Sequence, residues 1–353
     1  MKDMDRLKVA VVGCGAIAHE HLRFIDAFDA VDLVAVCDRS KATADFAREL
    51  FNARRSFTDH LEAFSESNPD VVHVCTPPET HSRIVIEALN SGAHVICEKP
   101  MTGTAAETIA LLDEADRCGK LLVESRNMLF NDVVVELDHL IKQGRIGSIR
   151  DIDVAMSLNF LKGPFGDLNL SGPGVNAPAG VVHDFLPHLA YLFLHFAGDN
   201  QPVEQVAGFL ENRSENPRVG FDHLDTLIRT KSCRGRLRIL SDVKPDTFRL
   251  ALHGTEGAVE TDFYNPYLRV QRGGVSGVRA PFAQIRSGIG TAVWGARNFR
   301  DKVLRHGPYH GLSRMLEAVY RSLMDGTAPP IRSTDIRATA LLVDRIVDLG
   351  KVT

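Results

Sequence analysis

The sequence lacks the marks of several large classes of protein. No stretch approaches the roughly 18 consecutive apolar residues of a membrane-spanning helix. The charged start, residues 1–8, has no apolar region followed by a cleavage site of the kind that a secretory signal needs. The formal net charge is only −4, which argues against broad binding to nucleic acid or to membrane surfaces. We therefore expect a cytoplasmic protein with neither kind of partner.

Cysteine is scarce and scattered, and no two cysteines form a C-x-x-C pair. The six residues are Cys14, Cys37, Cys75, Cys97, Cys118 and Cys233. Several of them lie inside apolar runs, so buried free thiols in a reducing compartment explain the pattern better than a disulfide framework. Metal-ligand spacing is also missing, and we expect no metal site. Internal repeats and low-complexity segments are absent as well.

Two domains are the natural expectation for a chain of 353 residues. Through about residue 125, short apolar runs alternate with helical segments near 17–28, 41–51, 80–91 and 104–118. The runs cover 8–12, 31–37, 71–75, 94–97 and 120–124. Apolar strands separated by helices predict a parallel sheet covered on both faces. We therefore assign residues 1–127 to an α/β domain with the doubly wound sheet of the Rossmann fold.

The rhythm changes after residue 131. A helix over 132–143, a strand over 150–160, a glycine- and proline-rich loop over 163–180 and a helix over 181–196 are expected. Strand-like runs between 205 and 272 follow one another with only turns between them, which predicts an open, mainly antiparallel sheet. Residues 273–308 show no clear pattern, and helices near 310–325 and 334–350 close the chain.

We therefore predict a substrate-binding and oligomerisation domain of the α+β class over residues 128–333. The C-terminal helix, 334–353, is a candidate to pack back on the first domain. An open antiparallel sheet leaves one face uncovered, and residues 222–253 are rich in apolar side chains. A homodimer or homotetramer that forms through this sheet is the expected assembly.

A nucleotide-binding fingerprint opens the chain. Residues 9–18 read as a strand, a G-x-G-x-x-A turn and a helix start. Gly13 permits the tight turn and Gly15 the approach of pyrophosphate, which Ala16 and Ile17 meet at the helix start. Asp38 ends the second strand and is expected to accept hydrogen bonds from the ribose hydroxyls, which favours NAD.

Arg39 leaves NADP open, because a guanidinium pairs with a 2′-phosphate, although a solvated surface arginine is the alternative. Thr76, Pro77, Pro78 and His81 follow the third apolar run. Such loops lie where these sheets bind ligands, so we count them as cofactor contacts. Simple turn chemistry explains them equally well.

Three residues form a candidate catalytic set. Lys99 follows a buried strand directly, in the stretch Cys97–Pro100. Asp184 and His188 are four apart and share a face if the segment is helical, although Pro187 lies between them. The alternative is that Asp184 only caps the helix and that His188 is a buried histidine with its hydrogen bonds satisfied. Histidine suits proton transfer in alcohol oxidation, lysine stabilises a developing alkoxide, and aspartate orients the hydroxyl or the imidazole.

This order of motifs resembles the Gfo/Idh/MocA oxidoreductase family over nearly the whole chain. The motifs are G-x-G-x-x-A, an acid after the second strand, T-P-P-x-x-H, E-K-P and D-x-x-x-H. The resemblance implies that Lys99 contacts nicotinamide and substrate, that His188 is the acid/base and that Asp184 positions the reacting hydroxyl. It also implies a cis peptide bond between Lys99 and Pro100. Glu98 and Asn127 join the expected cofactor contacts.

The substrate is less well marked. The family often has an arginine–phenylalanine pair after the sixth strand, where this chain has Leu129 and Phe130, and its lead-in to the aspartate differs at His183. A basic stretch with interleaved aromatics covers 286–305 and suits a phosphate or carboxylate, a solvated face or a subunit contact. The candidate substrate contacts are Asn159, Lys162, His183, Arg297 and Arg300.

Three functions remain open at this point. The first is net NAD(P)-dependent oxidation or reduction of a CH–OH group in a sugar, polyol or sugar derivative. The second is epimerisation or glycoside cleavage by transient oxidation with tightly bound NAD. The third is a non-enzymatic sensor that binds NAD, against which the presence of Lys99, Asp184 and His188 together argues.

Overall fold

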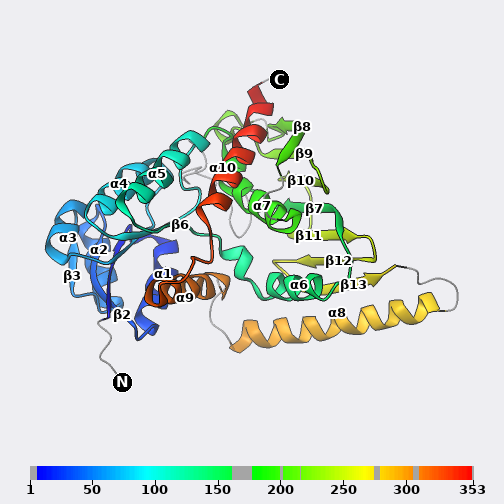
Figure 1. Ribbon diagram of the computed structural model, residues 1–353, viewed down its shortest axis with the longest axis horizontal. Helices are drawn as coiled ribbons and strands as arrows, with labels where there is room; N and C mark the ends of the chain where they lie inside the picture. The colour runs from blue at the N-terminus through cyan, green and yellow to red at the C-terminus, as the bar shows by residue number, and fades with distance from the viewer. Residues whose placement is uncertain are drawn as a thin grey trace. The chain divides into compact units, whose positions relative to one another are not determined.

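The structure, a computed structural model, describes residues 6–160, 177–198, 202–214, 216–273, 279–304 and 310–351. Its residues divide into two compact units. The first unit comprises 1–127 with 311–340, and the second comprises 128–310 with 341–353. Each unit has its own sheet, and Figure 1 shows the elements of both.

A parallel sheet of six strands forms the first unit, in the order β3-β2-β1-β4-β5-β6. The strands are β1 (Leu7–Val12), β2 (Val31–Cys37), β3 (Arg55–Phe57), β4 (Val71–Val74), β5 (His94–Cys97) and β6 (Leu122–Glu124). The helices between them are α1 (Ala16–Ala27), α2 (Lys41–Leu50), α3 (His60–Ser67), η1 (Pro78–Thr80), α4 (His81–Asn90) and α5 (Ala105–Cys118). In Figure 1, α4 and α5 cover one face of this sheet and α1 covers the other. The predicted Rossmann fold is confirmed.

Side-chain caps start three of these helices. The side chains of Ser40, Asp59 and Thr104 each accept a hydrogen bond from a first-turn amide, of α2, α3 and α5 respectively. Such a cap contributes about 1 kcal/mol to stability. The sequence analysis missed β3 and α3, because a three-residue strand and an eight-residue helix are too short for periodicity to mark.

Helix α9 (His310–Asp325) belongs to the first unit from Gly311 on, although the sequence predicted residues 311–333 in the second domain. Met315 and Tyr320 are fully buried, and the Tyr320 ring stacks 5.9 Å from the Phe24 ring of α1. This packing adds α9 to the Rossmann core. Helix α10 (Ser333–Val347) contributes residues through Ala340 to the first unit and the remainder to the second.

The second unit contains a sheet of seven strands in the order β13-β12-β11-β7-β10-β9-β8. They are β7 (Ile149–Ser157), β8 (Val203–Glu211), β9 (His223–Thr230), β10 (Arg234–Leu240), β11 (Thr247–Gly254), β12 (Gly257–Asp262) and β13 (Leu268–Arg272). Neighbouring strands are antiparallel except β7 and β10, which are parallel. The predicted mainly antiparallel sheet is confirmed.

Helix α7 (Val181–Ala197) packs on one face of this sheet, against β7, β10 and β9. Gly235 in β10 makes the close approach, because a Cβ there would lie 2.2 Å from the ring of Phe193. The unit also contains η2 (Asn127–Phe130, from Met128 on), α6 (Asp132–Lys142), η4 (Pro217–Val219) and η5 (Asp348–Lys351). The apolar sides of α6, α7 and the sheet form its core.

The stretch without a clear pattern folds into the long helix α8 (Arg279–Leu304). Pro281 and the glycines at 288, 290 and 295 lower its helix propensity and hid it from sequence analysis. Trp294 packs against the core of the second unit. Large apolar side chains on the helix are exposed by 60 to 72%, namely Phe282, Ile285, Ile289, Val293 and Phe299. We call these five residues the α8 stripe.

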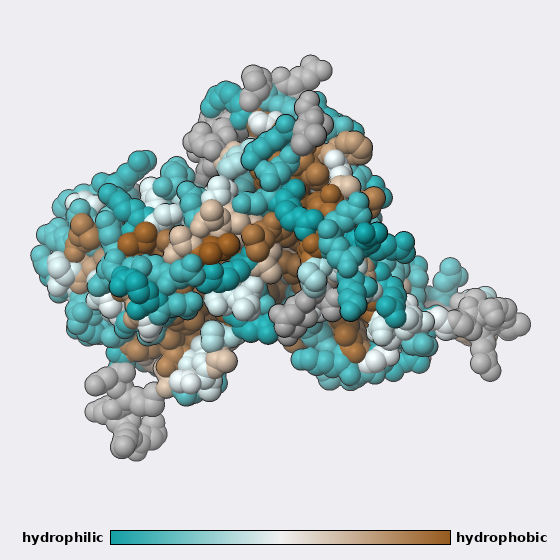
Figure 2. All heavy atoms as spheres, turned by 45° about the horizontal axis from the view of Figure 1, so that its top comes forward, coloured by the Kyte–Doolittle hydropathy of each residue, from teal (hydrophilic) through white to brown (hydrophobic). Residues whose placement is uncertain are grey.

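Hydrophilic residues cover much of the face seen in Figure 2, and apolar residues gather between them in a few places. In the described part of the chain, the helices are all too short or too polar to cross a membrane. The same residues include no group of three His, Cys, Asp or Glu side chains that could hold a metal ion. All six cysteines are free thiols, and all but Cys118 are buried.

Candidate active site

The loop after β1 is shaped for close approach. Gly13 has a φ of +88°, and a Cβ on it would lie 2.7 Å from the backbone carbonyl of Cys75. Gly15 is the N-cap of α1 and provides no side-chain cap. An added Cβ at Gly15 would meet no described atom within 4 Å. The first-turn amides of α1 can therefore hold the pyrophosphate of a dinucleotide.

Asp38 lies at the end of β2 and ties two loops together. Its Oδ2 accepts a hydrogen bond from the amide of Cys14 at 2.9 Å, and its Oδ1 accepts one from the amide of Ser40 at 2.9 Å. The carboxylate is thereby fixed beside the glycine turn and keeps lone pairs for ribose hydroxyls. Arg39 is exposed next to it. The set of Gly13, Gly15 and Asp38 fits a bound dinucleotide.

His81 joins the two loops that follow β4 and β5. Its Nε2 lies 2.7 Å from the carbonyl oxygen of Thr76, and its Nδ1 lies 3.1 Å from that of Pro100. The ring is fully buried, and burial lowers its pKa although the carbonyl contacts oppose the shift. His81 therefore braces the loop that carries Lys99. Direct contacts of His81, Thr76, Pro77 and Pro78 with the cofactor stay a prediction.

Lys99 follows β5 and is half-buried. The predicted cis peptide bond between Lys99 and Pro100 is present. The amide of Lys99 lies 3.3 Å from Oε2 of Glu98, whose Oε1 lies 2.9 Å from Nε2 of His21. Burial alone would raise the pKa of Glu98, but the hydrogen bond from His21, with Ser125 and Lys99, holds it at about 2. An anionic carboxylate thus stands beside the lysine.

A buried ion pair after β6 escaped the sequence analysis. Nε and Nη2 of Arg126 both lie 3.1 Å from Oε2 of Glu124, and Oε1 of Glu124 accepts from the amide of Met101 at 3.2 Å. Through the Met101 amide, the Glu124–Arg126 pair therefore holds the segment that follows Lys99. Two opposite charges two residues apart at the end of an apolar strand were the available signal. Asn127 follows them and is half-buried.

Helix α7 presents Asp184 and His188 one turn apart, and it runs through Pro187 without ending. His188 Nδ1 lies 2.6 Å from the hydroxyl of Tyr191, which is almost fully buried. The tyrosine therefore sets the orientation of the imidazole. Sequence reasoning had considered Asp184 for that task and missed Tyr191, although a position three residues on in a helix is a neighbour.

The start of α7 is held by a close backbone crossing. A Cβ on Gly180 would lie 2.2 Å from the carbonyl oxygen of Val219, and one on Gly220 would lie 2.7 Å from Cα of Gly180. The amide of Val182 also donates to the carbonyl of Phe221 at 3.2 Å. Only glycine fits at the two crossing positions, so this contact fixes where the turn before Asp184 lies.

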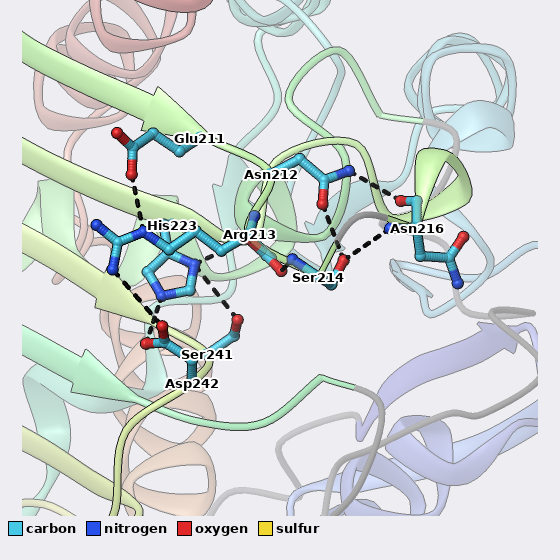
Figure 3. A network of polar contacts seen from close by, with 9 residues as sticks. Glu211, Asn212, Arg213, Ser214, Asn216, His223, Ser241 and Asp242 are labelled. Carbon is cyan, nitrogen blue, oxygen red and sulfur yellow. Dashed lines mark hydrogen bonds and ion pairs between the residues drawn. The ribbon is translucent and has the colours of Figure 1, made fainter.

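A polar cluster stabilises the β8–β9 connection next to that crossing (Figure 3). His223 Nδ1 lies 2.8 Å from Asp222, and its Nε2 lies 2.7 Å from Asp242. The Asp222 carboxylate also accepts hydrogen bonds from the backbone amides of Arg213 and Ser214. The bond to His223 is the main cause that lowers the pKa of Asp242, and it lowers that of Asp222 against the effect of burial. The cluster therefore favours the ionised forms of Asp222 and Asp242, and its hydrogen bonds hold the loop in place.

The candidate substrate residues are scattered. His183 is buried, its Nδ1 has no hydrogen-bond partner among the described residues, and burial lowers its pKa. Asn159 is half-buried just past β7, and Lys162 lies outside the described residues. Arg297 and Arg300 are exposed on α8, where the Arg297 guanidinium lies 5.2 Å from the centroid of Trp294. Their substrate contacts stay a prediction.

The site residues divide between the units. Lys99 and the residues that fit the dinucleotide belong to the first unit, and Asn127 is the last residue of its first segment. Asp184, His188 and Tyr191 belong to the second.

Comparison with known proteins identifies the first unit. Residues 7–125 match the model of the Gfo/Idh/MocA oxidoreductase family, described as an NAD-binding Rossmann fold. The chain is 25% identical over 235 residues to 4-carboxy-2-hydroxymuconate-6-semialdehyde dehydrogenase of Sphingobium, covering 67% of this chain and 71% of that protein. It is 30% identical over 144 residues to inositol 2-dehydrogenase of Salmonella typhimurium, covering 40% of this chain and 43% of that protein.

Likeness to solved structures extends over both units. The WlbA dehydrogenase of Bordetella pertussis, crystallised with NADH and UDP-GlcNAcA, matches with a TM-score of 0.81 and 19% identity. The match covers 100% of this chain and 97% of that one. At this identity the likeness establishes the fold.

Proposed function

Since residues 7–125 belong to the NAD-binding Gfo/Idh/MocA oxidoreductase family, we propose that this chain is an NAD(P)-dependent dehydrogenase or reductase. Its substrate is a sugar, polyol or sugar derivative that reacts at a CH–OH carbon. The observation that carries the proposal is the fixed carboxylate of Asp38 beside the uncapped N-terminus of α1, with Lys99 on another loop of the same unit. The names of the relatives, a semialdehyde and an inositol dehydrogenase, support the reaction class.

The side chains divide the chemistry between them. A bound nicotinamide supplies or accepts the hydride. His188 takes or returns the hydroxyl proton, and its Nδ1 lies 2.6 Å from the Tyr191 hydroxyl, which orients the ring. The Lys99 ammonium stabilises negative charge on the substrate oxygen as it develops. Asp184, one turn before His188 on α7, positions the reacting hydroxyl.

The experiment that tests the reaction class is a screen for hydride transfer. Purified protein is offered sugars, polyols and sugar nucleotides with NAD and with NADP, and the absorbance of the reduced nicotinamide is followed. The Lys99→Ala variant serves as the blank for each hit. Signal in the wild type alone supports the proposal, while substrates consumed without net change in nicotinamide point to transient oxidation by a retained cofactor.

Asp38→Ala is expected to weaken NAD binding and to relax the preference against NADP. The carboxylate accepts ribose hydroxyls and repels a 2′-phosphate, and each lost charged hydrogen bond costs about 1.5–3 kcal/mol, or about tenfold to 100-fold in affinity. We therefore expect the Kd for NAD to rise by about tenfold or more while the Kd for NADP changes little or falls. Fluorescence titration with both cofactors measures the two constants.

Asp32→Ala is the matched control, because Asp32 lies on the same strand, β2, and pairs with Arg54 at the surface. It should leave both dissociation constants unchanged. An equal loss of NAD and NADP affinity in Asp38→Ala would mean that the aspartate only holds the loops together and does not choose the cofactor.

Self-association is the second part of the proposal. On the open sheet face, Phe209 and Leu227 are exposed by 65% and 61%, which supports the predicted partner there. Charged pairs such as Arg236–Asp225, with 2.6 Å between Nη2 and Oδ2, interrupt that face. The α8 stripe is a second exposed apolar surface on the same unit. Contiguous exposed apolar side chains of this kind mark contact surfaces.

Ile285→Glu with Ile289→Glu is expected to shift the protein toward smaller assemblies. Two buried carboxylates without partners would oppose an interface by several kcal/mol, about 100-fold or more in affinity. Size-exclusion chromatography with light scattering measures the change. Thr291→Glu on the same helix, but outside the stripe, is the control. Wild-type mass in the double variant would exclude the stripe as a subunit contact.

A further inference from the structure

A chain of buried hydrogen bonds runs through the first unit from Glu98 to Tyr320. His21 Nε2 lies 2.9 Å from Glu98 Oε1, and His21 Nδ1 lies 2.7 Å from His73 Nδ1. His73 Nε2 lies 2.7 Å from the Tyr320 hydroxyl. The two histidines and the tyrosine are fully buried and come from α1, β4 and α9. We call these four residues the Glu98 relay.

Charge at the two ends determines where the protons of the relay lie. Glu98 is a carboxylate, because its pKa is held at about 2 although burial opposes this. Burial raises the pKa of Tyr320 well above its usual value, so the hydroxyl keeps its proton. Burial, and in second place the neighbouring His21, lowers the pKa of His73 well below its usual value, so His73 carries one proton.

When His21, like His73, carries one proton, the donor to Glu98 is its Nε2 and the three hydrogen bonds point in one direction. The Tyr320 hydroxyl donates to His73 Nε2, so the single proton of His73 lies on Nδ1 and is donated to His21 Nδ1. His21 keeps its own proton on Nε2 and donates it to Glu98. We assign these tautomers from the donor and acceptor capacities of the groups. In such a chain each bond polarises the next, so a change at Tyr320 is felt at Glu98.

Glu98 faces several titratable groups besides His21. Burial raises the pKa of the Cys75 and Cys97 thiols well above the usual value, and burial lowers that of His81. These three groups are therefore uncharged at neutral pH. Lys99 is the cation whose charge helps to keep the pKa of Glu98 low. The anionic Glu98 at the end of the relay and the cationic Lys99 that follows it in the sequence therefore stabilise each other's charge.

We propose that His21, His73 and Tyr320 are positioning residues for Lys99, because they hold the Glu98 carboxylate anionic and fixed in direction beside it. The inference rests on the proposed function in that it takes Lys99 as catalytic. A buried polar chain is a costly way to fill a core, since every lost partner leaves an unpaired group. We infer that this buried chain serves a function, which is to position the Glu98 carboxylate beside Lys99.

Tyr320→Phe tests the relay at its far end. The variant removes one hydroxyl and keeps the ring that stacks on Phe24. Nitrogen-15 NMR of the histidine side chains, without substrate, should show wild-type His21 protonated on Nε2 and His73 on Nδ1. In the variant, the His73 signal should leave that state because its Nε2 has lost its donor.

The effect on Lys99 is read separately. Lys99 is half-buried, so its amine can be labelled by reductive methylation with carbon-13 and titrated by NMR. We expect the titration midpoint to move to lower pH in Tyr320→Phe, since the ammonium then faces a less firmly held carboxylate. The alkaline limb of the pH–rate profile should move the same way. We expect kcat to fall about fivefold, the worth of one hydrogen bond, at unchanged KM for NAD.

Tyr267→Phe is the matched control, because it removes a tyrosine hydroxyl that donates to Glu260 in the second unit. It should change neither the histidine signals nor the Lys99 titration. An unchanged Lys99 midpoint in Tyr320→Phe, or wild-type histidines with the opposite tautomers, would overturn the relay. The wild-type tautomers decide the matter even if the variant does not fold. Both NMR readouts need no turnover, whereas failure of the proposed function appears as wild-type turnover in Lys99→Ala.

Discussion

Lys99→Ala should nearly abolish turnover and leave NAD binding intact. The lysine stands at the end of β5 beside an anionic Glu98, and its ammonium is the group that we assign to the developing alkoxide. Removal of one such charge-stabilising donor costs about 10²–10³ in kcat. We assign dinucleotide binding mainly to the α1 amides and Asp38, so the Kd for NAD should change by less than about threefold, the effect of losing one weak contact. Initial rates and fluorescence titration measure the two effects.

Lys244→Ala is the matched control for this variant. Lys244 also precedes a cis proline, Pro245, but its Nζ pairs with Asp246 at the surface, 2.7 Å from Oδ1. It should retain wild-type rates. If Lys99→Ala loses NAD binding in parallel with turnover, the lysine holds the cofactor and is not the alkoxide stabiliser. Near wild-type activity would remove Lys99 from the site altogether.

His188→Asn is expected to lower kcat by about 10²–10⁴ and to remove the pH dependence of the rate near neutrality. General acid–base catalysis by a positioned side chain contributes an effect of this size. Asparagine keeps a polar group near Tyr191 but cannot carry the proton. A pH–rate profile from pH 5 to 9 measures both changes, and added imidazole should restore part of the lost rate.

His195→Asn provides the comparison on the same helix. His195 Nε2 lies 2.8 Å from Oδ1 of Asp138, and the side chain is one third exposed. This substitution should leave the pH–rate profile unchanged. The assignment of His188 is falsified if the His188→Asn profile keeps the wild-type shape and differs only in height.

Much of the first unit could be predicted because its signals are local. Three features can be recognised from the residues next to them in the sequence. They are the turn from Gly13 to Gly15, the acid at Asp38 and the lysine at the end of an apolar strand. The structure adds what those signals do not carry. Asp38 accepts hydrogen bonds from the amides of two loops, and the buried His81 connects the loop of Thr76 to the loop that carries Lys99.

The residues that escaped prediction depend on contacts between distant segments. His73 lies in an apolar strand and Tyr320 lies 247 residues later, so nothing near either residue announces their hydrogen bond. Helix α9 was assigned to the wrong unit for the same reason. Arg126 and Tyr191 are different, since each lies two or three residues from its partner, and a closer reading of charge pairs and helix spacing would have found them.

The late position of α9 in the chain has a consequence for biosynthesis. Proteins fold progressively as they leave the ribosome, and N-terminal domains normally close first. Here the first unit includes residues 311–340, so its core stays incomplete until these residues, which follow residues 128–310 of the second unit, have been made. Residues 128–310 of the second unit, by contrast, have been synthesised before α9 is complete. Until α9 has been made, Nε2 of His73 lacks the Tyr320 hydroxyl that lies 2.7 Å from it in the folded protein.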